Sequence, residues 1–484
     1  MNDRSAAISL SSPVPTIAPA TSIPAKPAQQ PGAARTKLLL EGPILPTLLR
    51  LSAPNILNLL AFAGMITFDG FFLGRLGSDA LAGASLAFPF VMIVLQTTNS
   101  GMGNGVSSAI ARALGAGNRD RADALVFHAV LLALALGAGF AGVMLLGGPA
   151  LFRGMGGHDD MLAAALAYAN VAVGGAVCIC VLNFLGNAVR GTGNSNMGLP
   201  PAVLVACVLA HIGLSPLLIF GAGPLPALGP AGAAWGLILP FGIGSLGFIW
   251  YLRSGRSPLR LSFRGVTPRW ELFADILKVG VPGLINIAIT NLSVVALTAV
   301  AARLGRDAAI GYAMGARLEY VLQPIAFGVG TAIVAMVGTN WGARQYHRAR
   351  AIAWTGAAIV AAVCGVIGLI VAVDPRLWLR LFSDDPDVFR VGGLYLNLVG
   401  PSYVCFGLGL ALFYVAQGFG RGAAAAGANA GRLAANVAGG LAAIYWFGLG
   451  LTGFFAAIAA GFCLYAVLLV FAVTRVKVPD AANP

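Results

Sequence analysis

Charged residues are scarce in this sequence: only 10% of its residues are Asp, Glu, Lys or Arg, and 58% are hydrophobic. Soluble globular domains carry about 25% charged residues. A folded chain of this composition therefore lacks the polar side chains to cover a water-facing surface. We expect much of the surface to lie in lipid, which argues against a soluble enzyme or a soluble binding domain.

Charge is almost absent from runs of about 20 residues, the length at which a helix crosses the hydrocarbon core of a bilayer. These runs predict an all-α integral membrane protein with twelve transmembrane helices. They lie at residues 51–73, 82–105, 124–147, 161–186, 198–221, 230–252, 279–302, 309–338, 351–373, 391–416, 430–448 and 452–474.

The formal net charge of +13 indicates topology rather than affinity for nucleic acid. With the amino terminus in the cytoplasm, 22 of the 30 Lys and Arg lie in cytoplasmic segments and seven in outer loops, while Arg317 lies in a span. This asymmetry follows the positive-inside rule and predicts that both termini are cytoplasmic. We expect a multi-pass protein of the bacterial cytoplasmic (inner) membrane that contacts lipid and no nucleic acid.

Residue types typical of metal centres and catalysis are also few. The six cysteines all fall within apolar spans, which predicts buried thiols rather than a disulfide framework. The spans hold no cluster of His, Asp and Glu, and no motif for ATP binding occurs. A membrane-embedded enzyme is therefore the weaker interpretation, and we expect neither a cofactor nor a metal.

The composition divides the chain into five segments. A Ser-, Ala- and Pro-rich start cannot bury a core and predicts a disordered cytoplasmic tail. The predicted limits are 1–42 for this tail, 43–255 for a first lobe, 256–278 for a cytoplasmic linker, 279–475 for a second lobe and 476–484 for a second tail.

The two lobes repeat each other in sequence. Arg75–Ala80 aligns with Arg303–Ala308 at an offset of 228 residues, and Gly115-Ala116 aligns with Gly342-Ala343 at 227. Each half contains six spans, so both halves enter the membrane from the same side. We expect parallel repeats related by a pseudo-twofold axis along the membrane normal, with a cavity that opens alternately to the two sides.

Several short motifs occur in a fixed order along the chain. They are Phe68-Asp69-Gly70 with Gly74, Gly77 and Asp79–Ala82; Gly115–Asn118; Arg190-Gly191 with Gly193-Asn194; Gly229 with Gly232–Ala234; and Arg317 with Gly342-Ala343. In this order they resemble the multidrug and toxic compound extrusion (MATE) family, in particular its DinF-like bacterial branch. The resemblance covers about residues 43–475 and implies a twelve-helix, two-lobe exporter. It implies export of cationic, amphipathic or aromatic compounds in exchange for protons or sodium ions.

Only two acids, Asp69 and Glu319, lie in the predicted spans. A carboxylate inside a membrane is costly and usually marks a cavity or a partner. The resemblance supports Asp69 as the coupling residue, although capping or pairing with Arg75 at a helix end is the alternative. Where the DinF-like branch carries Asn-x-x-x-Asp-Pro in the fifth span, this chain has His211 and Ser215 before Pro216.

A histidine can exchange a proton near neutral pH, and residues 211 and 215 share one helix face. We therefore predict a proton shared between Asp69 and His211, with a packing histidine as the equal alternative. The sodium-linked branch of the family usually carries an acid soon after the proline of the seventh span. This chain has no acid soon after Pro282, which favours protons over Na⁺. Na⁺ stays possible, because Asn286, Thr290 and Asn291 offer oxygen ligands.

The predicted substrate-binding residues lie in the first span of the first lobe and in the first two spans of the second lobe. They are Phe68, Asn286, Asn291, Arg317, Glu319, Tyr320 and Gln323. We expect small organic cations or amphipathic drugs as substrates and a monomeric transporter. The rival within the same superfamily is a lipid-linked oligosaccharide flippase, which is disfavoured because Arg317 is the only strongly basic residue predicted inside a span.

Overall fold

The computed structural model describes residues 38–155, 158–193, 199–221, 226–262, 267–381 and 386–476, and every regular element in these ranges is a helix. Of the predicted tails, 1–42 and 476–484, residues 1–37 and 477–484 lie outside the described residues. Residues 38–41 form a helical turn in which Leu39 is fully buried. The chain therefore begins to pack a few residues before the predicted limit of the first lobe.

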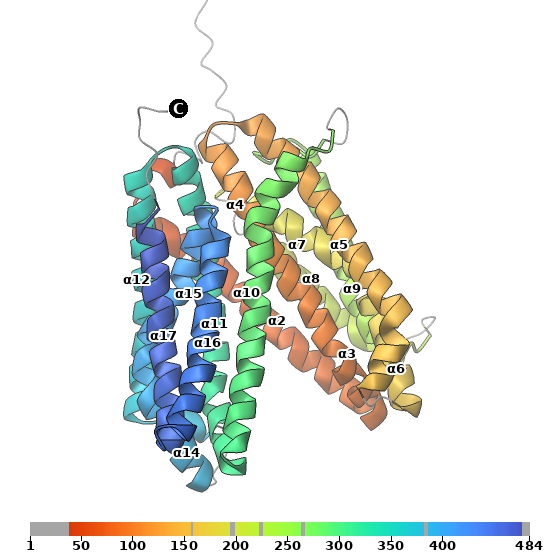
Figure 1. Ribbon diagram of the computed structural model, residues 1–484. Helices are drawn as coiled ribbons and strands as arrows, with labels where there is room; N and C mark the ends of the chain where they lie inside the picture. The colour runs from red at the N-terminus through yellow and green to blue at the C-terminus, as the bar shows by residue number, and fades with distance from the viewer. Residues whose placement is uncertain are drawn as a thin grey trace, which may run out of the picture.

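The first half crosses the bundle six times (Figure 1). Its second crossing is interrupted by a π-helical turn and its fourth is bent. The elements are α2 (Ile44–Leu76), α3 (Ser78–Gln96) with η1 (Thr97–Gly101) and α4 (Met102–Gly115), α5 (Arg119–Gly154), α6 (Asp159–Ala172) with α7 (Ala176–Gly191), α8 (Leu199–Phe220) and α9 (Pro230–Arg253).

The second half follows the same plan. Its elements are α10 (Trp270–Arg303), α11 (Arg306–Gly342), α12 (Tyr346–Val373), the short α13 (Arg376–Leu379), α14 (Pro386–Val399) with η3 (Gly400–Ser402) and α15 (Tyr403–Gly418), α16 (Gly422–Tyr445) and α17 (Gly450–Thr474).

Hydropathy identifies nine membrane-spanning helices in the described ranges, or ten when α6 and α7, bent by 41°, count as one. The other two crossings are α2, with 33 residues, and α16, with 24. Asn429, Arg432 and Asn436 interrupt the apolar sequence of α16. The predicted twelve-helix, two-lobe fold is confirmed. In α16 these polar residues lower the hydropathy below that of the helices that hydropathy identifies.

The backbone repeats the duplication seen in the sequence. Gly77 and Gly305, which align at the offset of 228, have φ angles of 136° and 122° at the turn between the first two crossings of each half. Residues with a side chain rarely adopt such φ angles, so glycine is required at both turns. The same equivalence recurs at Gly193 with Gly420 and at Gly221 with Gly448, all with positive φ.

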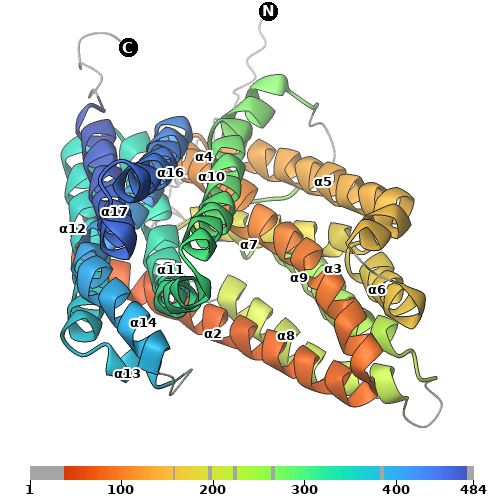
Figure 2. The same ribbon diagram turned by 60° about the horizontal axis from the view of Figure 1, so that its bottom comes forward.

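Both ends of the described chain lie at one end of the bundle (Figure 2). Arg348 donates to the carbonyl oxygen of Leu39 at 3.4 Å, and Arg350 donates to that of Val476 at 3.0 Å. Because the two arginines are neighbours at the start of α12, they hold both ends on the same side. This is the arrangement that an even number of crossings requires.

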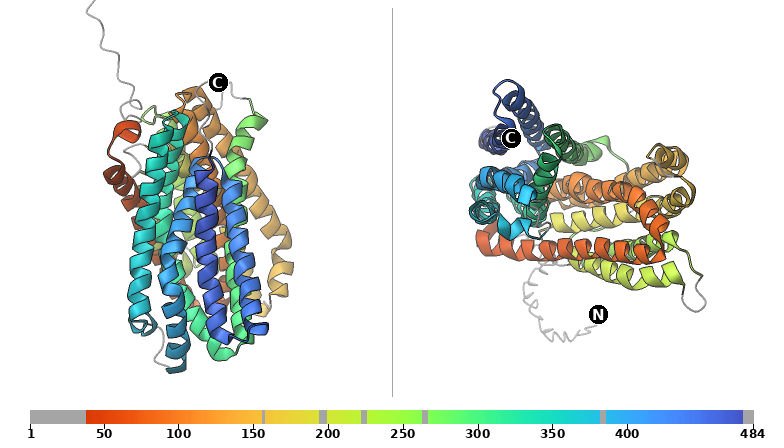
Figure 3. Two further views of the ribbon diagram at one scale, coloured as in Figure 1. Left: turned by 60° about the vertical axis from the view of Figure 1, so that its left-hand side comes forward. Right: turned by 90° about the horizontal axis from the view of Figure 1, so that it is seen from below.

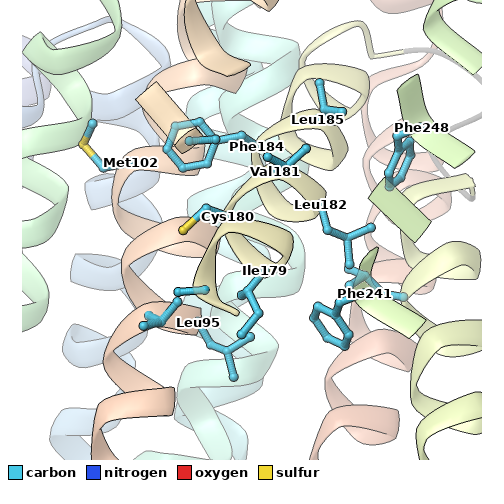
Figure 4. Packing of buried hydrophobic residues seen from close by; sticks show 14 of the residues in the cluster. Leu95, Met102, Ile179, Cys180, Val181, Leu182, Phe184, Leu185, Phe241 and Phe248 are labelled. Carbon is cyan, nitrogen blue, oxygen red and sulfur yellow. The ribbon is translucent and has the colours of Figure 1, made fainter. Parts of the chain in front are cut away.

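Each half has its own apolar core, and each first helix connects the two cores. The first-half core surrounds α7, where Leu182, Phe184 and Leu185 are buried among α3, α4, α8 and α9 (Figure 4). The start of α2 packs instead into the second core through Leu48 and Leu51. The start of α10 packs into the first core through Leu272 and Ile276, so the exchange is mutual.

At the end that holds the termini, α4 and α11 approach each other at backbone distance. A Cβ on Gly115 would lie 2.0 Å from the carbonyl oxygen of Thr339, and one on Gly342 would lie 2.1 Å from that of Arg112. Because these two contacts exchange under the repeat, they lie about its pseudo-twofold axis. At the opposite end the two lobes diverge (Figures 1 and 3).

An ion-paired carboxylate joins the lobes at the same closed end. Asp275 of α10 accepts from Arg112 of α4 at 2.8 Å and from Arg121 of α5 at 3.2 Å. These polar residues also explain why α10 begins at Trp270, nine residues before the start that hydropathy predicted. The last part of the predicted linker 256–278, from Trp270 on, therefore belongs to α10.

Candidate functional site

A chamber of about 480 Å³ lies between the lobes, within the size range of small-molecule sites. Helices of both halves line it, and aromatic rings alternate with amides. Its polar or aromatic lining includes Gln96, Asn99, Ser100, Asn183 and Phe241 from the first half, and Asn286, Thr290, Asn291, Ser293, Tyr312, Glu319, Tyr320, Gln323, Phe327, Phe406, Phe413, Tyr414, Asn429, Arg432, Asn436, Phe462 and Tyr465 from the second.

An amide network forms the wall between α10 and α16. The Asn429 side chain donates to Asn286 Oδ1 at 2.8 Å and to Thr290 Oγ1 at 3.0 Å. Its own Oδ1 accepts from Arg432 Nε at 2.9 Å. The oxygens of Asn286 and Thr290 that could bind a cation are therefore already engaged by an NH₂ group.

Arg432 is a buried cation on this wall, with only 5% of its surface exposed. Its guanidinium carbon lies 5.4 Å from the ring centroid of Tyr465, 5.6 Å from that of Phe462 and 6.0 Å from that of Phe406. Aromatic faces at this range stabilise a cation. The rings thus hold the charge in place without neutralising it.

Glu319 is the chamber's acid. Tyr395 is fully buried and donates its hydroxyl to Glu319 Oε1 at 2.7 Å. In the described chain Glu319 forms no ion pair with Arg432, although both line the chamber. The second-half wall therefore presents one negative and one positive group at separate places.

The first-half wall is built around the π-helical turn η1. A π turn leaves backbone groups outside the regular ladder, and such turns frequently occur at functional sites. The carbonyl of Asn99 accepts from Asn187 at 3.3 Å, and its side-chain oxygen accepts from Arg190 Nη2 at 3.2 Å. Asn183 donates to Thr98 Oγ1 at 2.8 Å. Arg190 thus lies directly behind a chamber-lining amide.

Asp69 and His211 form a buried hydrogen-bonded pair inside the first half. Asp69, on α2, is 7% exposed, and His211, on α8, is fully buried; His211 Nε2 and Asp69 Oδ1 are 2.7 Å apart. Tyr168 of α6 is buried near enough for the Asp69 charge to act on its hydroxyl. The two residues that the sequence predicted to share a proton are in direct contact.

The rest of this site is also polar and enclosed. His211 Nδ1 and Ser215 Oγ are buried and have no hydrogen-bond partner in the described residues. Both lie on α8, one turn apart on one face. The chamber reaches α8 at Leu204 and Val208, so His211 lies about one helical turn beyond the chamber wall.

Most of the predicted substrate residues line the chamber: Asn286, Asn291, Glu319, Tyr320 and Gln323. Phe68 and Arg317 do not. Phe68 is 44% exposed, because its neighbour Asp69 faces the bundle and adjacent helical residues point to different faces. Arg317 is exposed for the same reason, since Glu319, two residues on, faces the chamber.

The sequence interpretation missed the polar face of α16. It counted Arg432 among the cytoplasmic basic residues, although position 432 falls within the predicted span 430–448, and recognised Arg317 as the only base within a span. In the structure Arg190 and Arg432 are both buried in helices. The available signal was the spacing of Asn429, Arg432 and Asn436, which places three polar groups on one face of an Ala- and Gly-rich helix.

Two further expectations concern cysteines and metals. Cys180, Cys207 and Cys364 are buried free thiols, as predicted, whereas Cys463 is exposed. Within the described ranges no group of three or more His, Cys, Asp or Glu side chains could hold a metal ion. The site therefore consists of a chamber with two charged residues and a separate Asp–His pair.

Comparison with known proteins identifies the family to which this chain is similar. The MatE family model matches residues 54–217 and 282–441, once in each half. A FAD transporter of Shewanella oneidensis is 26% identical over 373 residues, covering 76% of this chain and 81% of that protein. The probable multidrug resistance protein NorM of Thermotoga maritima is 27% identical over 364 residues, covering 73% and 75%.

Among solved structures, an outward-facing multidrug resistance MATE transporter of the MOP superfamily superposes with a TM-score of 0.79 and 25% sequence identity. It covers 90% of this chain and 97% of its own. Each half thus carries the family's sequence pattern, and the whole bundle shares its architecture. The chain belongs to the MatE family and is a membrane transporter rather than an enzyme.

Proposed function

We propose that this protein is a proton-coupled antiporter that exports amphipathic, aromatic organic compounds across the bacterial cytoplasmic membrane. It works as a monomer with both termini in the cytoplasm. The observation that carries the proposal is the buried contact between Asp69 and His211, whose Oδ1 and Nε2 atoms are 2.7 Å apart. Ionisable residues inside a membrane are costly to bury, and they commonly mark an ion pathway or a proton relay.

The chemistry of the pair favours protons over Na⁺. A carboxylate and an imidazole in contact can hold one proton between them, and the doubly ionised and neutral forms of such a pair carry the same net charge. Na⁺, like other hard cations, prefers oxygen ligands, and an imidazole nitrogen offers none. The alternative oxygens of Asn286 and Thr290 accept from the Asn429 amide instead.

The first helix, α2, couples the protonation of the Asp69–His211 pair to the interface between the lobes. Its outer half carries Asp69, and its cytoplasmic half packs on the second lobe, where Asn55 donates to Thr331 Oγ1 at 2.9 Å. Losing the proton leaves a buried negative charge, which weakens the packing of α2 against α8. Any shift of α2 then acts on the second lobe at its other end.

The chamber supports amphipathic aromatic substrates. Its rings offer stacking surface, and its amides offer hydrogen bonds that fix orientation. Relatives of this chain include proteins named as probable multidrug resistance proteins and one named as a FAD transporter. An aromatic ring system that carries polar groups is common to both kinds of name.

The test is ethidium export in proteoliposomes under an imposed proton or sodium gradient. We expect the wild type to respond to the proton gradient alone. Asp69→Asn should bind ethidium but lose gradient-driven export. Asp79→Asn is the matched control, because Asp79 is an exposed carboxylate at the start of α3. Export driven by sodium alone, or normal export by Asp69→Asn, would overturn the proposal.

A further inference from the structure

Arg432 has hydrogen-bonding capacity that the protein does not use. Asn429 accepts from Nε at 2.9 Å, and the described chain offers no partner to Nη1 or Nη2. Neither nitrogen is fully enclosed by protein atoms, and Arg432 is one of the residues that line the chamber. Two parallel N–H groups of one guanidinium therefore face the space that a substrate would occupy.

The aromatic rings around Arg432 fix its orientation. Tyr465, Phe462 and Phe406 lie within 6.0 Å of the guanidinium carbon. A guanidinium fork held in this way matches the two oxygens of a carboxylate or phosphate. Between apolar walls such a charge-assisted pair is stronger than one at a protein surface, because the local dielectric constant is lower.

The charge around the chamber favours a substrate with an acidic group over a purely cationic one. Among the described lining residues, Glu319 is the only acid, and the Tyr395 hydroxyl already donates to it. Arg190 adds a second positive charge behind Asn99, where its Nε and Nη1 are buried and unpaired in the described chain. Arg432 and Arg190 together make an acidic group bind more tightly here, so a cation such as ethidium binds less tightly than a comparable aromatic acid.

We propose that Arg432 is an anion subsite and that the preferred substrates are aromatic compounds bearing a carboxylate or phosphate. The aromatic part stacks in the chamber while the acidic group pairs with Nη1 and Nη2. A positive group on the same molecule, where present, is placed toward Glu319. This inference rests on the proposed export function and specifies its substrate class.

The test uses two dye pairs that differ by one acidic group. Rhodamine B carries a free carboxylate and its ethyl ester does not; flavin mononucleotide carries a phosphate and riboflavin does not. Affinities are measured by fluorescence polarisation with the purified full chain in detergent, without any gradient. The first pair reports on carboxylates and the second on phosphates.

We expect the wild type to prefer the acidic member of at least one pair. Arg432→Gln should lower the ratio of the affinity for the acidic dye to that for its partner without the acid about 10- to 100-fold. In the rhodamine pair the variant should bind the acid more weakly and the cationic ester more tightly, because it lacks the positive charge that attracts the one and repels the other. General damage to the fold cannot tighten either ligand.

Arg432→Lys keeps the charge and loses the planar fork, so it should retain part of the preference. An unchanged ratio in Arg432→Gln, or a wild type that binds the ester more tightly than the acid and riboflavin more tightly than its phosphate, overturns the subsite. Because these measurements need no gradient, they stand apart from the Asp69→Asn export test, whose failure would remove proton coupling and leave the subsite intact.

Discussion

The contact between α4 and α11 yields a prediction whose size follows from the structure. A methyl group on Gly115 would lie 2.0 Å from the carbonyl oxygen of Thr339, and Cβ atoms essentially never approach closer than 3.0 Å. Gly115→Ala must therefore separate the helices by roughly 1 Å, because a backbone carbonyl cannot rotate away as a side chain can. The change acts at the closed, terminus-bearing end.

Overpacking of this kind costs about 1–3 kcal/mol. The cost falls only on the conformation in which α4 and α11 touch. A differential effect of about 1–3 kcal/mol corresponds to a population shift of about 5- to 150-fold. Gly115→Ala should therefore favour the state that is open toward the cytoplasm, and Gly342→Ala should do the same through the symmetric contact with Arg112.

The assay is labelling of a single cysteine in the chamber, Ser100→Cys, in a background without the native cysteines. A membrane-impermeant maleimide is applied to inside-out and right-side-out vesicles. In Gly115→Ala, labelling from the cytoplasmic face should rise and labelling from the outer face should fall.

Gly139→Ala is the matched control, because nothing lies within 4 Å of a Cβ at this position in α5. If Gly115→Ala and Gly139→Ala gave the same labelling ratio, the α4–α11 contact would not be what closes the cytoplasmic side.

Three further predictions concern other contacts. Asp275→Asn removes the charge that joins α10 to two arginines of the first lobe and should raise cytoplasmic labelling about 5- to 30-fold, since the two partly exposed ion pairs together contribute about 1–2 kcal/mol. Asp123→Asn, whose carboxylate accepts a backbone N–H within the first half, should have little effect on labelling. Tyr395→Phe leaves Glu319 without its donor and should lower the stability of the purified protein by about 1–3 kcal/mol in thermal unfolding; an unchanged Tm would contradict the bond. His211→Gln keeps a hydrogen-bonding side chain that cannot hold a proton, so the pH profile of drug–proton exchange should move to lower pH, and an unmoved profile would argue for a packing histidine.

Most of the architecture could be predicted from the sequence because two independent signals agree. Hydropathy identifies the spans, and the repeat fixes their pairing through glycines such as Gly77 and Gly305. The exception is the region around Arg432. A charged residue near the end of an apolar run indicates the end of a span. In the structure the aromatic rings around the guanidinium and its hydrogen bond to Asn429 hold this arginine inside the helix bundle.

The Asp69–His211 contact illustrates a different limit. Sequence alone identified both residues, since an acid and a histidine within spans are costly and rare. It could not establish that α2 and α8 bring them to 2.7 Å, because contacts between distant helices depend on tertiary packing. Phe68 shows the same limit in reverse: it belongs to the same motif as Asp69, yet faces away from the bundle interior.

The chamber itself had no sequence signature of its own. Its wall combines η1, α10, α11 and α16, of which the first and last lie more than three hundred residues apart and meet only in the folded bundle. Asn286 and Gln323 were identified because each is polar within an apolar span. Arg190 was not, because an arginine at the end of α7 resembles a cytoplasmic loop residue.

The most direct test of proton coupling is to count the protons released when substrate binds to the purified protein in weakly buffered detergent solution. Wild type should release close to one proton for each ethidium bound near neutral pH, and Asp69→Asn should release none while still binding the dye. Equal proton release from the two proteins would show that the proton is held elsewhere and would contradict the role assigned to the Asp69–His211 pair.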